Sequence, residues 1–278
     1  MLSSLSSGVS GLENFQEQMD VIGNNIANIN TTAFKAGIVN FADAFSNTLQ
    51  GAGPNTPAVQ VGTGVEITSI SNNWAAGGLT NTGIPSNLAI SGSGNGFFEV
   101  FDPVTKATYL TQDGTFSVNA NGNLVTANGD YVQGYTTGAL TTTGDVTINT
   151  TGSTSTAAIS SYTIDPQGNI TVTQADGTTF VCGQVLLTNV TDPQMLVNEG
   201  DNLYSNQQAA NGGTLPTLTA PGLNGLGTLQ AGALESSNVD LSNEMANLIT
   251  AQRAFEANSK IITTSNEVLQ TLVQMKQS

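Results

Sequence analysis

Residues 240–278 read DLSNEMANLITAQRAFEANSKIITTSNEVLQTLVQMKQS, a stretch that contains neither glycine nor proline. Apolar side chains recur at every seventh position of it, at Leu241, Leu248, Phe255, Ile262 and Leu269. A seven-residue repeat places its members on one face of a helix and is typical of a seam that packs against another helix. Asp240 or Ser242 is suited to cap the first turn. The stretch therefore predicts one long helix over residues 240–278.

The start of the chain carries a matching element. Its apolar residues alternate at three and four positions, at Leu2, Leu5, Val9, Leu12, Met19 and Ile26. This spacing predicts a second helix with an apolar seam over residues 1–30. Gly8, Gly11 and Gly23 each lower its helix propensity by about 1 kcal/mol relative to alanine. We therefore expect packing against a partner helix to stabilise it.

The middle of the chain has a different character. Glycine and proline cluster from Gly51 to Pro57, and runs such as Ile170-Thr171-Val172-Thr173 alternate apolar and polar side chains as half-buried strands do. Turn dipeptides that favour hairpins follow at Asp113-Gly114, Asn121-Gly122, Asn128-Gly129 and Asp176-Gly177. The pattern predicts an antiparallel β-rich domain.

Together these patterns predict an α+β fold with a central antiparallel β-rich domain between N- and C-terminal helices. The expected division is an N-terminal helix at 1–30, a connecting segment at 31–70, the β-rich domain at 71–220, a return segment at 221–239 and a C-terminal helix at 240–278.

Composition excludes several classes of function. The formal charge is -15, with 5 Lys plus Arg against 20 Asp plus Glu, so nucleic acid is not an expected partner. No apolar run approaches the roughly 20 residues of a membrane-spanning helix, and the first residues lack the pattern of a cleaved signal peptide. We expect no membrane insertion.

The sequence offers little for catalysis or metal binding. It has no histidine, which is the commonest general base, and its carboxylates are scattered. A glycosidase pair such as Asp113 with Asp130 is far less favoured than two ordinary turn aspartates. Cys182, the single cysteine, lies in an apolar strand and is interpreted as a small packed side chain. We expect no enzyme activity, catalytic residue, metal or cofactor.

Both ends of the chain contain recognisable motifs. Near the start they are Ser10-Gly11-Leu12, Asp20-Val21-Ile22-Gly23-Asn24-Asn25-Ile26-Ala27-Asn28 and Thr32-Ala33-Phe34-Lys35. Near the end they are Glu235-Ser236-Ser237-Asn238-Val239-Asp240-Leu241 and Ala251-Gln252-Arg253-Ala254-Phe255-Glu256-Ala257-Asn258. The chain resembles the flagellar rod and hook protein family in these motifs, and the resemblance extends over nearly all of it.

Two further motifs bear on the choice within that family. Asn40-Phe41-Ala42-Asp43-Ala44-Phe45 and Tyr131-Val132-Gln133-Gly134-Tyr135 are more similar to the hook subunit than to the distal rod subunit. The short segment from Gln50 to Val61 favours the hook as well, whereas the total length is close to that of distal rod subunits. The resemblance therefore implies a hook subunit, with a distal rod subunit of the basal body as the alternative.

The resemblance implies a mechanical function. Subunits would form a tubular polymer whose terminal helices build an axial coiled coil and which transmits torque from rod to filament. Axial packing is expected from Leu5, Leu12, Ile26, Leu248, Phe255, Ile262 and Leu269. Hydrogen bonds at the helix end or across subunits are expected from Asn24, Asn25 and Asn28.

The same resemblance implies the partners and the location. The partners are other copies of the chain, the flagellar rod, hook-cap and hook–filament junction proteins, and the flagellar type III export apparatus. The location is the flagellar hook or basal body, outside the cell after export without a cleaved signal peptide. A cysteine–lysine cross-link between hook subunits is conceivable for Cys182 on this resemblance.

A more remote alternative belongs to a different class. Terminal heptads are also compatible with a surface adhesin or binding module that carries a β-rich head on a coiled-coil stalk. An adhesin would form a small closed oligomer, whereas a rod or hook subunit would form open helical tubes.

Overall fold

A computed structural model describes residues 2–51, 53, 57–92, 96–136, 142–150, 153, 155 and 157–277. The chain divides into two compact units. The helical unit comprises Met1–Ile29, Ala36–Asn73 and Val239–Ser278, and the β unit comprises Asn30–Lys35 and Trp74–Asn238.

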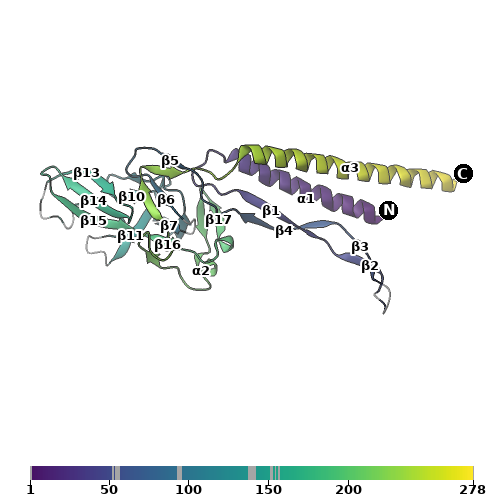
Figure 1. The fold of residues 1–278 in the computed structure, drawn as a ribbon, viewed down its shortest axis with the longest axis horizontal. Helices are drawn as coiled ribbons and strands as arrows, with labels where there is room; N and C mark the ends of the chain where they lie inside the picture. The colour runs from purple at the N-terminus through teal and green to yellow at the C-terminus, as the bar shows by residue number, and fades with distance from the viewer. Residues whose placement is uncertain are drawn as a thin grey trace. The chain divides into compact units, whose positions relative to one another are not determined.

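The helical unit contains the two long helices that the periodicity predicts. Helix α1 spans Leu2–Ala27 and helix α3 spans Leu241–Gln277. Asp240 caps α3, because its Oδ1 accepts a hydrogen bond from the Ser242 N–H at 2.9 Å. Figure 1 shows the two helices side by side, with the N- and C-termini at the same end of the pair. Among the described residues, no helix is both long and apolar enough to cross a membrane.

A two-stranded ribbon completes the helical unit. Strand β1 (Gly37–Asp43) pairs antiparallel with β4 (Val65–Asn72), and β2 (Ser46–Gln50) pairs antiparallel with β3 (Val59–Gly62). The ribbon packs on α1 through the Phe15 and Phe41 rings, whose centroids lie 5.8 Å apart. Asn14 of α1 also donates a hydrogen bond to the carbonyl oxygen of Val65 at 2.8 Å.

The β unit is built around one large antiparallel sheet. Its strands follow the order β13-β14-β15-β11-β7-β8-β18-β17, with β9, β10, β12, β16 and β19 attached at its sides. These strands are β7 (Gly96–Phe101), β8 (Thr108–Thr111), β9 (Ser117–Val118), β10 (Leu124–Val125), β11 (Tyr131–Tyr135), β12 (Thr143–Asp145), β13 (Ile159–Ile164), β14 (Asn169–Gln174), β15 (Thr179–Val185), β16 (Leu187–Asn189), β17 (Val197–Gly200), β18 (Leu203–Ser205) and β19 (Leu218–Thr219).

Two small ladders and two short helices accompany this sheet. Strand β20 (Thr228–Ala231) pairs with β6 (Leu88–Ser91), and β21 (Ala233–Glu235) pairs with β5 (Leu79–Asn81). The 3₁₀ helix η1 spans Pro193–Met195 and α2 spans Gln207–Ala210. The observed class is therefore α+β, with a large antiparallel sheet domain and a helix near each end of the chain, as the sequence predicts.

The main core of the β unit lies against the central strands. Phe98 and Leu187 are fully buried, and the Phe98 ring meets Phe116 edge-on at a centroid distance of 5.1 Å. Leu226 and Leu229 belong to the same core, although both come from the segment that the sequence division treats as a return segment. A second cluster packs Trp74 against Phe97 and Tyr204.

The boundaries between the two compact units differ from the segment boundaries expected from the sequence. Residues 31–70, expected as a connecting segment, contain the whole β2–β3 ladder and most of the β1–β4 ladder. Residues 221–238, expected to return the chain, contribute β20 and β21 to the β unit. Strands β20 and β21 are too short to show a clear alternation in the sequence. Val59-Gln60-Val61 and Val65-Glu66-Ile67-Thr68 do alternate, and sequence reasoning missed this signal.

We predict that a fragment of residues 30–238 unfolds cooperatively, because it retains both segments of the β unit. A fragment of residues 30–219 should be largely unfolded, since it removes Leu226 and Leu229 from the core. Losing a buried leucine costs about 2–5 kcal/mol, a large share of a domain's stability. Urea unfolding followed by the fluorescence of Trp74, the single tryptophan, would compare them. Equal stability of the two fragments would contradict the boundary at residue 238.

Candidate functional site

The two long helices pack antiparallel, and glycines of α1 set how closely they approach. A β-carbon added to Gly8 would lie 3.2 Å from Cγ1 of Ile262, and one added to Gly11 would lie 2.7 Å from Nδ2 of Asn258. The residue number thus increases along α1 as it decreases along α3, which is the mark of an antiparallel pair. These two glycines weaken α1 as an isolated helix, and their lack of a side chain is what lets α3 come close.

The apolar seam predicted from the sequence lies at this contact within one chain. Ala251 of α3 and Ile22 of α1 are buried, at 1% and 4% exposure. The side chains expected to pack axially are half-buried, namely Leu5, Leu12 and Ile26 on α1 and Leu248, Phe255, Ile262 and Leu269 on α3. Two other members of the predicted seams, Val9 and Leu241, are exposed. The two helices therefore cover each other's seam side chains, and none of these residues is fully enclosed.

Contact with α1 leaves many apolar side chains of α3 exposed. They are Leu241, Met245, Ile249, Ile261, Val268, Leu272, Val273 and Met275. Ile249 is 58% exposed and Met275 is 70% exposed. Apolar surface of this extent on a helix is typical of a surface that contacts another molecule.

The three asparagines predicted to act at the end of the first helix take different positions. Asn25 is buried and pairs with the backbone of Gly37, donating from Nδ2 to the carbonyl oxygen and accepting from the N–H, each at 2.9 Å. Asn28 donates to the Asn24 side chain at 2.6 Å, and Asn24 is exposed. These contacts fasten the end of α1 within its own chain.

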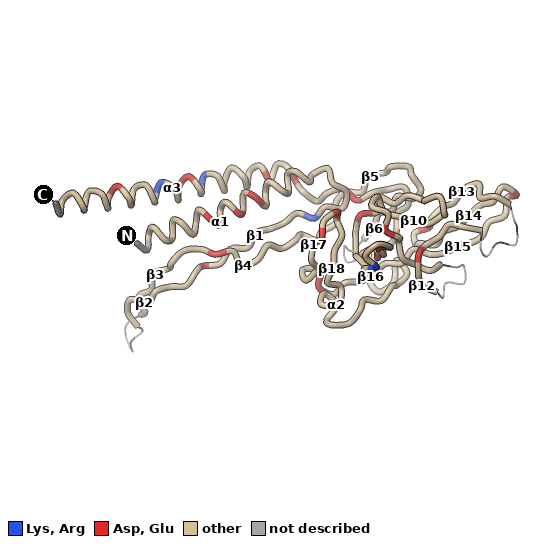
Figure 2. Tube along the Cα trace, turned by 180° about the vertical axis from the view of Figure 1, so that it is seen from behind, with Lys and Arg blue, Asp and Glu red and all other residues tan. Residues whose placement is uncertain are grey.

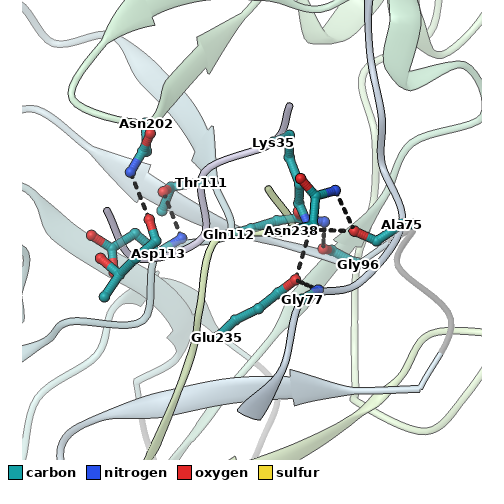
Figure 3. Close-up of polar contacts among 11 residues, drawn as sticks. Lys35, Ala75, Gly77, Gly96, Thr111, Gln112, Asp113, Asn202, Glu235 and Asn238 are labelled. Carbon is teal, nitrogen blue, oxygen red and sulfur yellow. Dashed lines mark hydrogen bonds and ion pairs between the residues drawn. The ribbon is translucent and has the colours of Figure 1, made fainter. Parts of the chain in front are cut away.

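A buried ion pair joins the two segments of the β unit. The Lys35 ammonium lies 2.7 Å from Glu235 Oε1, with side-chain exposures of 1% and 4%. Lys35 also donates to the carbonyl oxygen of Ala75 at 3.3 Å, and the same Glu235 oxygen accepts from the Gly77 N–H at 2.8 Å. Asn238 adds a bond to the Ala75 carbonyl at 2.9 Å. Figure 3 shows this polar cluster.

The cluster brings together the N-terminal and C-terminal sequence motifs. Lys35 ends the Thr32-Ala33-Phe34-Lys35 motif, and Glu235 begins the motif that runs to Leu241. Sequence reasoning used both motifs only as a family signature and did not pair these residues. The signal was present, since Lys35 is one of only five basic residues in the chain.

The cysteine and the two aspartates that were considered for reactivity or catalysis have structural explanations. Cys182 is 1% exposed, and burial raises the pKa of its thiol to about 11, so the unreactive thiol form predominates at neutral pH. Asp113 accepts hydrogen bonds from the Thr115 N–H and hydroxyl group, as a turn aspartate does. Burial raises the pKa of Asp130, which accepts a hydrogen bond from Thr126.

A cavity of about 220 Å³ lies in the β unit, and the residues that line it include Thr31, Asp113, Asn128, Asp201 and Asn202. Asp130 does not line it. Within the described ranges, no three or more Asp, Glu or Cys side chains are grouped to hold a metal ion.

Comparison with known families identifies the chain. The Flagella basal body rod protein model matches residues 5–35, the Flagellar hook protein FlgE/F/G D1 domain model matches 89–172, and the Flagellar basal body rod FlgEFG protein C-terminal model matches 230–275. The flagellar basal-body rod protein FlgG of Bacillus subtilis (strain 168) is 37% identical over 282 residues, covering 99% of this chain and 100% of that protein. The chain belongs to the flagellar rod and hook protein family. This membership places it in the bacterial flagellum.

The relatives within this family correct the preference for a hook subunit. FlgG of Buchnera aphidicola subsp. Baizongia pistaciae (strain Bp) is 35% identical over 280 residues, covering 98% of this chain and 99% of that protein. The flagellar hook protein FlgE of Treponema pallidum (strain Nichols) is 46% identical, but over only 142 residues, 49% of this chain and 30% of that protein. Full-length similarity therefore favours a rod protein.

We predict that Lys35→Met destabilises the β unit of this flagellar protein by about 3–5 kcal/mol, because Glu235 stays buried without its cation. Adding Glu235→Gln should recover much of that loss, since glutamine is neutral and still accepts from the Gly77 N–H. Urea unfolding followed by Trp74 fluorescence measures both. Lys106→Met, at an exposed lysine of the same unit, is the matched control and should change stability by less than about 0.5 kcal/mol. Equal effects at the two lysines would contradict the role of the pair.

Proposed function

We propose that this chain is a structural subunit of the distal rod of the flagellar basal body and assembles with copies of itself into an axial tube. The observation that carries the proposal is its similarity to basal-body rod proteins over 98–99% of its length. We propose no catalytic function, because the rod and hook family consists of structural proteins.

The exposed faces of the terminal helices support self-assembly. The seam side chains are already half-covered within one chain, so a monomer can hold its helix pair together. Apolar side chains such as Ile249, Ile261 and Leu272 nevertheless stay exposed in the monomer. Burying them between copies is favourable by about 25 cal/mol per Å² of apolar area. In the proposed tube, helix pairs of neighbouring copies form the axial coiled coil.

A heterologous contact of this kind suits a mechanical polymer. One surface of a subunit binds a different surface of the next, and the contact propagates because it does not close on itself. The tube would transmit torque along its axis. Its proposed partners are further copies, the neighbouring rod and hook proteins, and the flagellar export apparatus that delivers the subunits.

The hook subunit remains the second candidate. It is favoured by the 46% identity to a hook protein over 142 residues, which is higher than the identity to either rod protein. The two candidates predict different defects when the subunit is missing, because the distal rod precedes the hook in the axial structure.

We predict that deleting the gene for this chain from its host leaves basal bodies whose rods end early and carry no hook. Electron microscopy of purified basal bodies measures rod length and hook attachment. Complementation with the wild-type gene is the control and should restore both. A complete rod that lacks only the hook would contradict the distal rod proposal and support the hook subunit.

We also predict that Ile249→Asp abolishes polymer formation and leaves the folded monomer intact, because Ile249 is exposed and outside the seam. Leu248→Asp, the same change one residue earlier, should instead separate the helices of the monomer by placing a charge in the seam. Far-ultraviolet circular dichroism of dilute protein and sedimentation of the polymer distinguish the two effects. Normal polymer from the Ile249 variant would contradict the role of the outer face of α3.

A further inference from the structure

Helix α1 carries an acidic stripe on its exposed face. Glu13, Glu17 and Asp20 are four and three residues apart, so they lie along one side of the helix, and all three are exposed. This side is turned away from the glycines that face α3. The helix contains no lysine or arginine, and Figure 2 shows acidic positions along α1 without a basic one. The acidic stripe therefore has no basic partner on its own helix.

The basic residues of the helical unit lie on α3. Of the five in the chain, Lys35 is buried and Lys106 belongs to the β unit, which leaves Arg253, Lys260 and Lys276 on α3. Figure 2 shows basic positions on α3. Arg253 and Lys260 are exposed and seven residues apart, so they share one face.

Neither of these two cations is held firmly within the chain. Arg253 lies 2.9 Å from Glu256, but the two side chains are 76% and 64% exposed, and surface pairs of this kind contribute little. Lys260 forms no ion pair with any residue that the structure describes. It also borders two hollows of the helix surface, one beside Phe255 and the other beside Ile261, which give a partner side chain room to approach it.

We propose that the acidic stripe of α1 binds Arg253 and Lys260 of a second copy of this chain. The proposal deepens the proposed function and rests on it, because it names the charged contact that orients neighbouring copies. Opposite charges at matched spacing on the two helices favour another copy as the partner, since each copy offers both halves of the contact.

The direction of the helices fixes the pairing. Copies in a head-to-tail polymer share one direction, so α1 of one copy and α3 of the next run antiparallel, as they do within a chain. Glu13 and Asp20 are seven residues apart, about 10 Å along the helix, and so are Arg253 and Lys260. An antiparallel alignment then sets Glu13 against Lys260 and Asp20 against Arg253. In the same alignment, Glu17 faces Glu256.

This alignment distinguishes the three acids of the stripe. The chain carries a formal charge of -15, so general repulsion between copies predicts that neutralising any acidic residue favours assembly. Specific pairing predicts the opposite for Glu13 and Asp20, because each would lose a cation. Glu17 faces another carboxylate, so neutralising it should favour assembly, as general repulsion predicts. The sign of the effect therefore separates specific pairing from net charge.

The test measures the critical concentration for polymerisation of the purified full-length chain, by light scattering with electron microscopy of the product. Glu13→Gln and Asp20→Asn should each raise it about threefold. Glu17→Gln, the matched control with the same change in net charge, should leave it unchanged or lower it. The rises should shrink in 0.5 M salt, where the Debye length is only about 4 Å.

Charge reversal tests the partner residue directly. Lys260→Glu should raise the critical concentration more than Glu13→Gln does, and adding Glu13→Lys should restore assembly toward the wild-type value. Circular dichroism of the monomers checks folding, and rescue in the double variant separates pairing from misfolding. Lowered values for all three neutral variants, or no rescue by the double reversal, would overturn the pairing while leaving the proposed function intact. A wild-type chain that forms no polymer would contradict both.

Discussion

The ion pair between Lys35 and Glu235 closes the β unit across 200 residues of sequence. Its members are only 4% and 5% exposed, and an unpaired charge at such a depth is strongly destabilising. The pair therefore requires residues 30–35 and the end of the β unit to come together before the structure is complete. The chain passes between the two units at 29/30, 35/36, 73/74 and 238/239, and Lys35, Ala75 and Asn238 are hydrogen-bonded beside the last three of these points. One polar cluster thus fixes three of the four ends of the β unit.

The helical unit depends on a different constraint, the close approach at Gly8 and Gly11. Glycine reduces the stability of an isolated helix, yet here a β-carbon would meet α3 at 3.2 Å or less. Stability that α1 lacks through propensity is supplied by the seam with α3. Because one face of each helix is used in this way, contacts with other molecules must use the remaining faces. Those faces differ, being acidic on α1, and apolar with scattered charges on α3.

The choice between rod and hook illustrates the limits of short motifs. Tyr131-Val132-Gln133-Gly134-Tyr135 favoured the hook, but in the structure it is the central strand β11. A β-carbon on Gly134 would lie 2.2 Å from the Gln184 carbonyl oxygen, so this glycine is required by packing between neighbouring strands. A motif that reflects sheet packing is compatible with either protein. Similarity over the whole length weighs more, because it covers nearly all of this chain and of the rod proteins, whereas the hook protein matches only 49% of the chain.

The sequence by itself determined the elements that local physics controls. The seven-residue repeat and the cap at Asp240 placed α3, and Gly122, Gly129 and Gly177 adopt the positive φ angles that their hairpin turns need. Asp113-Gly114 has the same two residue types as the hairpin turn Asp176-Gly177, but it forms no hairpin. At this position the glycine allows the Leu88 backbone to approach closely. Only the tertiary structure decided this, as it decided the pairing of Lys35 with Glu235. Periodicity and turn preference act over a few residues, whereas contacts between distant segments depend on how the whole chain packs.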